Sequence, residues 1–436
     1  MIRRFFVAAL AAFASLGVIA AGAFGSDVGK RFPSEMRVMV DKVTGVPINV
    51  LTTGTFNDAK IYQTHPQWTA DGQWIVFRSN RGAGGSSQAF AVHESTGVIV
   101  QLTDGPGTGT GSLNLARKSN KLYFFRRTGD GPKLIELNLD PLFADSKANA
   151  MNEPAAYERV VMTLPSNLRE SGGFGLDADE KMAYMGVTRL DDLPKGSPEL
   201  LRLTTRATTG PATQPGNGAR RRGGAIPQVP GGLRSIDLTT GEMKKIIDVP
   251  WTMGHVQTNP WAPGEIIYCN ETGGDAPQRM WFVRADGTGN KALYKETPDE
   301  WITHEAVIDK DQVIFVIMGH LPRLRLKPTG IAVINLRTDE MKILGQVDEG
   351  RGFWHCQGSA DGKWAVGDNF NGNIYLINRL TSEITLLTTD HKMRPDHTHP
   401  TFSPDGTRIL IESGLLSNGV NLNLMVVPVP GEKRMP

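Results

Sequence analysis

The sequence has few cysteines and no excess of either charge. Only Cys269 and Cys356 occur among 436 residues, and they fall in different copies of the repeat described below. A disulfide framework is therefore not expected, and both residues are predicted to be buried as small hydrophobic side chains. Lys and Arg number 47 against 45 Asp and Glu, a net charge of +2. This balance gives no broad basic surface, so no nucleic-acid partner is expected.

Long apolar runs are confined to the N-terminus. Arg3 and Arg4 precede an apolar stretch that ends in Ala21-Gly22-Ala23, which has the small residues of a cleavage site. Residues 1–25 are thus predicted to be a signal peptide, and the protein to be exported, either periplasmic or secreted. The alternative is an uncleaved anchor, because the stretch is near the length that spans a bilayer. No later run is long enough, so no stable membrane association is expected after cleavage.

Several catalytic motifs are absent as well. The chain has no Gly-x-Ser-x-Gly elbow, no Walker A loop and no His-Glu-x-x-His pair. The chain therefore lacks the motifs on which serine hydrolases, nucleotidases and zincins depend.

Short hairpin signatures recur along the chain. Each copy has a strand, an Asp-Gly turn and a second strand of alternating apolar residues, and a second hairpin follows with an Asp/Asn-x-x-Thr-Gly turn. Clear first hairpins are HPQWTADGQWIVFRS (65–79), HCQGSADGKWAVGDN (355–369) and HPTFSPDGTRILIES (399–413), with weaker copies at 113–125, 173–185, 255–269 and 304–316. Seven units of two hairpins predict an all-β fold, a seven-bladed β-propeller of four-stranded antiparallel blades.

The two ends of the chain complement each other. A hairpin at 37–52, RVMVDKVTGVPINVLT, precedes the first unit, whereas the last unit lacks its second hairpin. We expect the N-terminal segment to complete the last blade and close the ring, which removes open sheet edges. Residues 30–436 are thus predicted to form a single propeller domain, and a closed ring favours a monomer.

One segment does not fit the repeat. Residues 204–231 are rich in Gly, Pro and Arg and have no apolar periodicity, so they are predicted to be a flexible insert in the third blade. Arg220–Arg222 within it is interpreted as a solvated surface run. The alternative is that this run steers an anionic polymer toward the protein.

Five of the nine histidines open the first strand of a unit. His65, His304, His355 and His399 lie seven residues before the second residue of the first-hairpin turn or its equivalent, and His255 opens its strand in the same way before a longer turn. This position begins the innermost strand, so these side chains are expected to converge at one face of the ring. Converging imidazoles bind a metal, transfer protons, or hold an anionic or sugar ligand. The alternative is an inherited residue without function, although Leu113 and Gly173 show that the position tolerates loss.

Further polar residues are expected near the same face. The segment DHKMRPDHTHP contains His391, His397 and His399, and the last two alternate on an extended segment, which predicts a ligand pair. The alternative is an ordinary polar loop. Arg78 and Arg81 lie on a loop of that face, and guanidinium groups suit carboxylates.

At this point the sequence resembles the oligogalacturonate lyase family over most of the chain. The resemblance lies in FPSEMRVMVDKVTG (32–45), GHVQTNPWAPGEIIYCNETGG (254–274), WITHEAVIDKD (301–311) and HCQGSADGKWAVGDN (355–369). It implies a seven-bladed propeller that binds manganese through histidines and cleaves oligogalacturonides by β-elimination. The implied partner is a uronic-acid oligosaccharide.

The resemblance also implies residue roles. His255 would be the proton-abstracting base, and His304 and His355 would be metal ligands for a divalent metal, Mn²⁺. The third histidine ligand is His391 by spacing or His399 by register. The family's glutamine ligand is replaced here by Arg351-Gly352, so Gln357 is the substitute considered.

The resemblance leaves three points open. His65 receives no role in the comparison and is either an inherited copy or a substrate contact, and the catalytic arginine of the family has no assigned position. A lyase for another uronic-acid polymer is one alternative function. A non-catalytic TolB-like propeller, serving as a platform for a protein or glycan, is the other.

Overall fold

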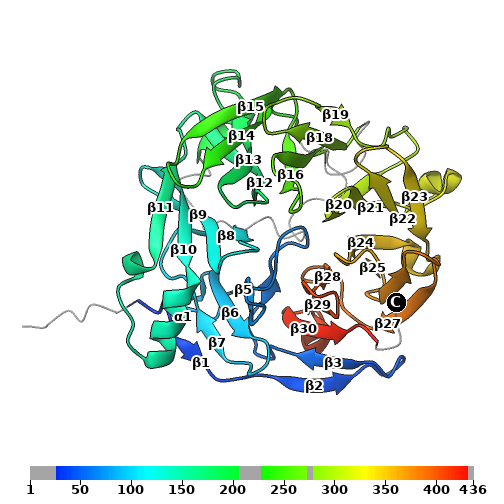
Figure 1. Ribbon diagram of the computed structural model, residues 1–436, viewed down its shortest axis with the longest axis horizontal. Helices are drawn as coiled ribbons and strands as arrows, with labels where there is room; N and C mark the ends of the chain where they lie inside the picture. The colour runs from blue at the N-terminus through cyan, green and yellow to red at the C-terminus, as the bar shows by residue number, and fades with distance from the viewer. Residues whose placement is uncertain (1–25, 206–226, 273–277, 431–436) are drawn as a thin grey trace, which may run out of the picture.

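Seven antiparallel sheets form a closed ring in the computed structural model, which describes residues 26–205, 227–272 and 278–430 (Figure 1). The seven-bladed β-propeller predicted from the repeats is confirmed. The predicted signal peptide, residues 1–25, and most of the predicted insert, residues 206–226, lie outside the described residues.

Each blade is ordered from the ring axis outward (Figure 1). The innermost strands are β4 (Ala59–Lys60), β8 (Thr108–Leu115), β12 (Leu168–Leu176), β16 (Met253–Thr258), β20 (Ile302–Asp309), β24 (Phe353–Gly358) and β28 (Thr401–Phe402). The second strands are β5 (Trp74–Ser79), β9 (Lys121–Thr128), β13 (Met182–Arg189), β17 (Glu265–Asn270), β21 (Gln312–Ile317), β25 (Trp364–Asn369) and β29 (Arg408–Ser413). The third strands are β6 (Gln88–His93), β10 (Gly131–Asn138), β14 (Gly231–Asp237), β18 (Met280–Arg284), β22 (Gly330–Asn335), β26 (Ile374–Asn378) and β30 (Asn423–Pro428). The fourth strands are β7 (Ile99–Gln101), β11 (Glu158–Thr163), β15 (Met243–Val249), β19 (Lys291–Ala292), β23 (Met341–Gly345), β27 (Ile384–Thr388) and, in the seventh blade, β3 (Pro47–Val50).

The Asp-Gly turns join the first two strands of a blade as predicted. In the sixth blade the Ser359 hydroxyl donates to Asp361 at 2.5 Å, and the Gly362 N–H donates to the Ser359 carbonyl at 3.0 Å. Gly362 has a φ of 76°, a conformation that glycine adopts without steric cost. The Ser/Thr-x-Asp-Gly sequence thus fixes the turn through both its side chains and its backbone.

The N-terminal segment closes the ring. Strand β3 pairs with β30 through Asn49 with Val426 and Val50 with Met425, and β2 (Arg37–Val40) adds a fifth strand outside it. The predicted closure of the last blade is therefore confirmed. The first blade also has a fifth strand, because β1 (Arg31–Phe32) pairs with β7.

Apolar side chains pack between neighbouring blades and form the core. Ile48 and Met425 of the seventh blade, for example, share one buried cluster with Trp364 and Val366 of the sixth. Both cysteines are buried and free, as predicted. Both faces of a blade meet a neighbouring blade, which explains why strands such as β21 and β22 are buried along almost their whole length.

A few helices lie in the connections between strands. They are α1 (Leu139–Ala148), α2 (Pro198–Thr205) and the short 3-10 helices η1 (Ala83–Gly85), η2 (Pro154–Ala156), η3 (Pro322–Leu326), η4 (Glu349–Arg351) and η5 (Leu415–Ser417). Among the described residues, none of the helices is long and apolar enough to span a membrane.

The innermost strands are interrupted by bulges. In the fourth blade Gly254 pairs with Cys269 and Gln257 with Ile267, so two residues of β16 face one residue of β17. The fifth and sixth blades have the same irregularity after Thr303 and Phe353. Bulges redirect side chains, and here they turn the repeated histidine position toward the ring axis.

Candidate functional site

Three of the repeated histidines have an unusual backbone conformation, two of them in the bulges and the third just before β28. His255, His304 and His399 have φ values of 47°, 57° and 45°, in the left-handed region that non-glycine residues seldom adopt. In the third blade, glycine occupies this place, with φ of 79° at Gly173. Strain of this kind costs on the order of 1–3 kcal/mol per residue and is concentrated at functional sites. An inherited residue without function does not explain why histidine is kept where glycine is easier to accommodate.

Three of the five repeated histidines form a compact group. His304 and His355 have ring centroids 4.1 Å apart, and His355 and His399 have centroids 4.0 Å apart. They come from three consecutive blades, on β20, on β24 and just before β28. Their burial is nearly complete, with exposed fractions of 9%, 1% and 6%. We call His304, His355 and His399 the histidine triad.

Each ring of the triad is oriented by an acceptor at Nδ1. His304 Nδ1 lies at hydrogen-bond distance from the Trp354 carbonyl. His355 Nδ1 lies 3.2 Å from the Asp368 carboxylate, and His399 Nδ1 lies 3.1 Å from Glu412 Oε1. These acceptors place the ring proton on Nδ1, so Nε2 keeps its lone pair. Such backing by a carboxylate or carbonyl is the usual arrangement of metal-binding histidines.

Burial affects the charge of the triad. Burial and the neighbouring histidines hold the pKa of His304 and of His355 well below the usual range, so both rings are neutral. At His399 burial opposes the charge, but Asp396 and Glu412 outweigh it and raise the pKa. The Asp396, His399 and Glu412 ligand atoms also lie within 4.8 Å of one another. This corner of the site is therefore the most favourable for a cation.

The acceptors Asp368 and Glu412 were not identified from the sequence, although a signal for them exists. Each follows its histidine by thirteen residues, His355 to Asp368 and His399 to Glu412. The spacing is the same because the second strand of the hairpin returns beside the first. A carboxylate at this offset in a His-x-x-x-x-x-Asp-Gly hairpin would have predicted the pair.

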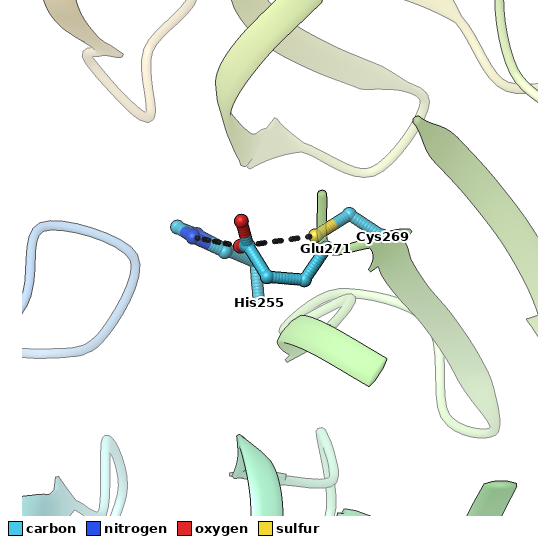
Figure 2. A group of neighbouring side chains, drawn as sticks. All are labelled: His255, Cys269 and Glu271. Atoms are coloured by element: carbon cyan, nitrogen blue, oxygen red, sulfur yellow. Dashed lines mark hydrogen bonds and ion pairs between the residues drawn. The ribbon is translucent and has the colours of Figure 1, made fainter. Parts of the chain in front are cut away.

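His255 lies across from the triad. Its Nε2 is 3.4 Å from Glu271 Oε2, and Glu271 lies between the imidazole and the Cys269 thiol (Figure 2). Tyr62 connects this side to the triad, because its ring centroid is 5.4 Å from those of both His255 and His399. The structure thus brings the residue expected to be the base close to the residues expected to be ligands.

Tyr62 belongs to a loop that the sequence did not predict. Lys60 pairs with Phe77 and Trp68 with Ile75, so residues 61–67 face the single residue Val76 and leave the sheet. The loop reaches the centre of the ring (Figure 1), where the Gln63 side-chain amide donates to the Cys356 carbonyl at 3.1 Å. We call residues 61–67 the central loop.

The central loop also changes the position of His65. Its offset matches that of the other histidines, but the chain has left the sheet there, and His65 Nδ1 faces the Asn114 side chain at 3.4 Å. It lines a small pocket with Arg117, Lys118 and Glu180, beside the turns of the first three blades. His65 is therefore not part of the triad, and its proposed contact with substrate remains a prediction.

The structure does not bring His391 and Gln357 into the triad. Both His391 nitrogens face hydroxyls, Nδ1 at 2.8 Å from Ser413 Oγ and Nε2 at 2.9 Å from Thr388 Oγ1. The Gln357 amide is used at both ends, since it donates to the Gln63 carbonyl at 3.1 Å and accepts from the Phe402 N–H at 2.5 Å. These bonds leave neither residue a free ligand atom directed at the triad.

The two candidate arginines differ in whether their guanidinium groups are already paired within the protein. Arg81 is buried and paired, with Glu35 at 2.7 Å and Asp58 at 2.5 Å. Arg78 is half-buried on β5, and its charge acts on Lys60 and Asp396 beside the triad. Arg78 therefore fits a substrate carboxylate better than Arg81 does.

Lys60 is a further residue that sequence reasoning missed. It is 2% exposed, its Nζ donates to the Ile61 carbonyl at 3.0 Å, and burial lowers its pKa to about 7. A buried lysine at the inner strand adjoining the central loop has no apolar pattern to reveal it, because strand β4 is only two residues long.

Comparison with known proteins places this site in context. No protein-family model matches the sequence. The oligogalacturonate lyase of Dickeya dadantii (strain 3937) is 24% identical over 414 residues, which are 88% of this chain and 94% of that protein. The oligogalacturonide lyase of Pectobacterium atrosepticum is 22% identical over 206 residues, 42% of this chain and 52% of that protein.

Two solved structures have the same fold. An oligogalacturonate lyase in complex with manganese aligns with a TM-score of 0.73 at 21% identity, covering 94% of this chain and all of that one. The oligogalacturonate lyase of Vibrio parahaemolyticus aligns with a TM-score of 0.72 at 19% identity, covering 93% and 100%. At these identities the structural matches establish the fold.

Proposed function

Because the chain is a distant homologue of the oligogalacturonate lyases, we propose that it is a metal-dependent lyase that cleaves oligogalacturonides, or a related uronic-acid oligosaccharide, by β-elimination. The observation that carries the proposal is the histidine triad, three adjacent rings from consecutive blades that are each held at Nδ1 by an acceptor. A structural role alone would not require three adjacent buried imidazoles, each with an acceptor at Nδ1.

Three buried imidazoles from adjacent blades are a donor set that divalent metals accept. Among the described residues, the groups whose three ligand atoms already lie within 4.8 Å of one another are Asp396 with His399 and Glu412, and His255 with Cys269 and Glu271, so binding by the triad requires its rings to turn toward a common point. We propose His304, His355 and His399 as the ligands, in preference to His391 and Gln357, whose polar atoms are already bonded within the protein. Imidazole nitrogens suit several divalent ions, so the choice of Mn²⁺ rests on the relative whose structure contains manganese. When bound, such an ion would act as a Lewis acid toward the carboxylate of the sugar.

The remaining steps fall to the protein. The proton at C5 of a uronate is removed by a base, the C4–O bond breaks, and the electron pair forms a C4–C5 double bond. His255 is proposed as that base, because it lies across from the triad and Tyr62 contacts both sides. Arg78, which is half-buried beside Asp396, is proposed to hold a carboxylate of the substrate.

A substrate panel tests this function. The protein is incubated with Mn²⁺ and, separately, with a chelator, using oligogalacturonides, alginate, ulvan and glucuronan, and the absorbance of the unsaturated product is followed. The proposal expects new absorbance with oligogalacturonides that the chelator abolishes. Absorbance only with another polymer would reassign the substrate, and none with any of them would favour a binding platform.

A further inference from the structure

We infer that His255, Cys269 and Glu271 form a second cation site, separate from the histidine triad, that takes a thiophilic divalent metal such as Zn²⁺ or Cd²⁺. The three ligand atoms all lie within 4.8 Å of one another. Glu271 Oε2 is 3.4 Å from His255 Nε2 and 4.0 Å from Cys269 Sγ (Figure 2).

These distances approach those of a tetrahedral site. Ligand atoms about 2.0–2.3 Å from a tetrahedral ion are roughly 3.3–3.8 Å apart. The separation of 3.4 Å lies within that range, the separation of 4.0 Å exceeds it by about 0.2 Å, and the third pair lies within 4.8 Å, so small rotations of side chains suffice. Cys269 and Glu271 are two residues apart around the end of β17, and His255 lies in the bulge of the adjoining β16, which explains their proximity.

The charges around the cluster favour a cation. Glu271 and Glu305 face the single guanidinium of Arg279, at 3.5 and 3.7 Å. Glu305 is fully buried, and its carboxylate faces the Arg279 guanidinium at 3.7 Å and the Cys269 thiol. Two carboxylates that share one guanidinium leave an excess of negative charge in a buried place, which a bound cation would compensate. Glu296 adds little charge, because burial raises its pKa to about 7.

The type of metal follows from the thiol. Burial raises the pKa of Cys269 well above its usual range, so without a metal it stays a protonated, unreactive thiol. A soft or borderline ion deprotonates and binds a thiol, whereas Mn²⁺ prefers oxygen and nitrogen ligands. With a thiolate, two carboxylates, one guanidinium and one divalent ion, the charges in the pocket sum to zero.

A metal bound at this site would prevent His255 from acting as the base. A metal on His255 Nε2 takes the lone pair that accepts a proton, so Zn²⁺ or Cd²⁺ in this site would inhibit cleavage even while the triad holds an ion. This consequence rests on the proposed function, whereas the binding itself does not.

Titration of the Mn²⁺-saturated protein with Cd²⁺ tests the site. The inference expects one equivalent of cadmium per chain beyond any that exchanges with manganese, counted by elemental analysis of both metals, and new ultraviolet absorbance from a cadmium–thiolate bond. Cys269→Ser should lose the absorbance and weaken the additional binding at least tenfold. Cys356→Ser, which removes the other buried thiol, should retain both.

A second variant and an activity assay complete the test. Glu271→Gln keeps the thiol and should also weaken cadmium binding about tenfold, which covers the case in which Cys269→Ser does not fold. Cadmium that displaces manganese without thiolate absorbance, or absorbance lost in Cys356→Ser alone, would overturn the inference. If the protein lacks lyase activity, the binding results still decide the site, and if it has activity, wild type should be inhibited more strongly than Cys269→Ser.

Discussion

At the scale of single residues, the histidines differ in the groups that their ring nitrogens contact. Those of the triad face an acceptor at Nδ1, His391 faces hydroxyls at both nitrogens, and His255 faces Glu271. The repeat offset made five histidines equivalent, and the contacts separate them into groups with different chemistry.

Asp368→Asn should weaken metal binding without removing the ligand. The asparagine oxygen still accepts a hydrogen bond, but the negative charge behind His355 is lost, and such changes cost about 10- to 100-fold in metal affinity. Calorimetric titration with Mn²⁺ measures the effect. Asp361→Asn, in the turn of the same hairpin, serves as the control, and equal affinity in both variants would argue against the role of Asp368.

His255→Ala and His304→Ala should separate catalysis from metal binding. Loss of the base is expected to reduce cleavage by about 10²- to 10⁴-fold with metal content unchanged. His304→Ala, and likewise His355→Ala, should lose bound metal and activity together. Elemental analysis and product absorbance measure both quantities. Equal loss of metal in all of these variants would contradict the division of roles.

Sequence reasoning identified the histidines, but it did not identify their surroundings. The offset from the first-hairpin turn located His304, His355 and His399, because the turn fixes the register of the inner strand. It misplaced His65, because an inserted loop changes the path of the chain while the offset stays the same. Contacts such as that of His391 with Ser413 depend on tertiary packing that no local pattern records.

At the scale of elements, the glutamine two residues after the histidine joins neighbouring blades. Gln257 donates to the Glu305 carbonyl of the next inner strand at 2.6 Å, and Gln357 bonds Phe402 of the next blade and Gln63 of the central loop. The repeated His-x-Gln sequence therefore combines a residue directed at the ring axis with one that bonds the adjacent blade.

Gln357→Ala should lower stability and leave metal content unchanged. It leaves the Phe402 N–H and the Gln63 carbonyl without partners, and each unsatisfied buried group costs about 1–3 kcal/mol. Thermal or denaturant unfolding measures the loss, with Gln73→Ala in a surface turn as the control. If the variant instead binds the metal more weakly and unfolds at the same temperature or denaturant concentration as the wild type, Gln357 would be supported as a ligand.

The elements themselves were largely predictable, and the central loop was not. Alternating apolar residues and Asp-Gly turns define strands because burial and turn geometry act over a few residues. Residues 61–67 carry no such pattern, and their position depends on contacts with the fourth, sixth and seventh blades.

At the scale of the whole molecule, stability depends on closing the ring with the N-terminal hairpin. Strand β3 covers the edge of β30, and Ile48 is fully buried in the cluster between the sixth and seventh blades. The same hairpin exposes Val38 on β2, which is 68% exposed.

Ile48→Ala should therefore cost far more stability than Val38→Ala. Deleting buried methyl and methylene groups of isoleucine costs about 2–5 kcal/mol, whereas an exposed substitution changes stability by about 0.5 kcal/mol or less. Chemical denaturation of the two variants measures the difference. Equal stabilities would mean that the closure contributes little to the folded state.

The masses of the products test the central claim, cleavage by β-elimination, most directly. The Mn²⁺-loaded protein is incubated with a saturated trigalacturonide, and the products are analysed by mass spectrometry. β-Elimination adds no water, so the account predicts two products whose masses sum to that of the substrate, one of them unsaturated. Products whose masses exceed the substrate by one water would show hydrolysis, and an intact substrate would show no cleavage, and either result would contradict the account.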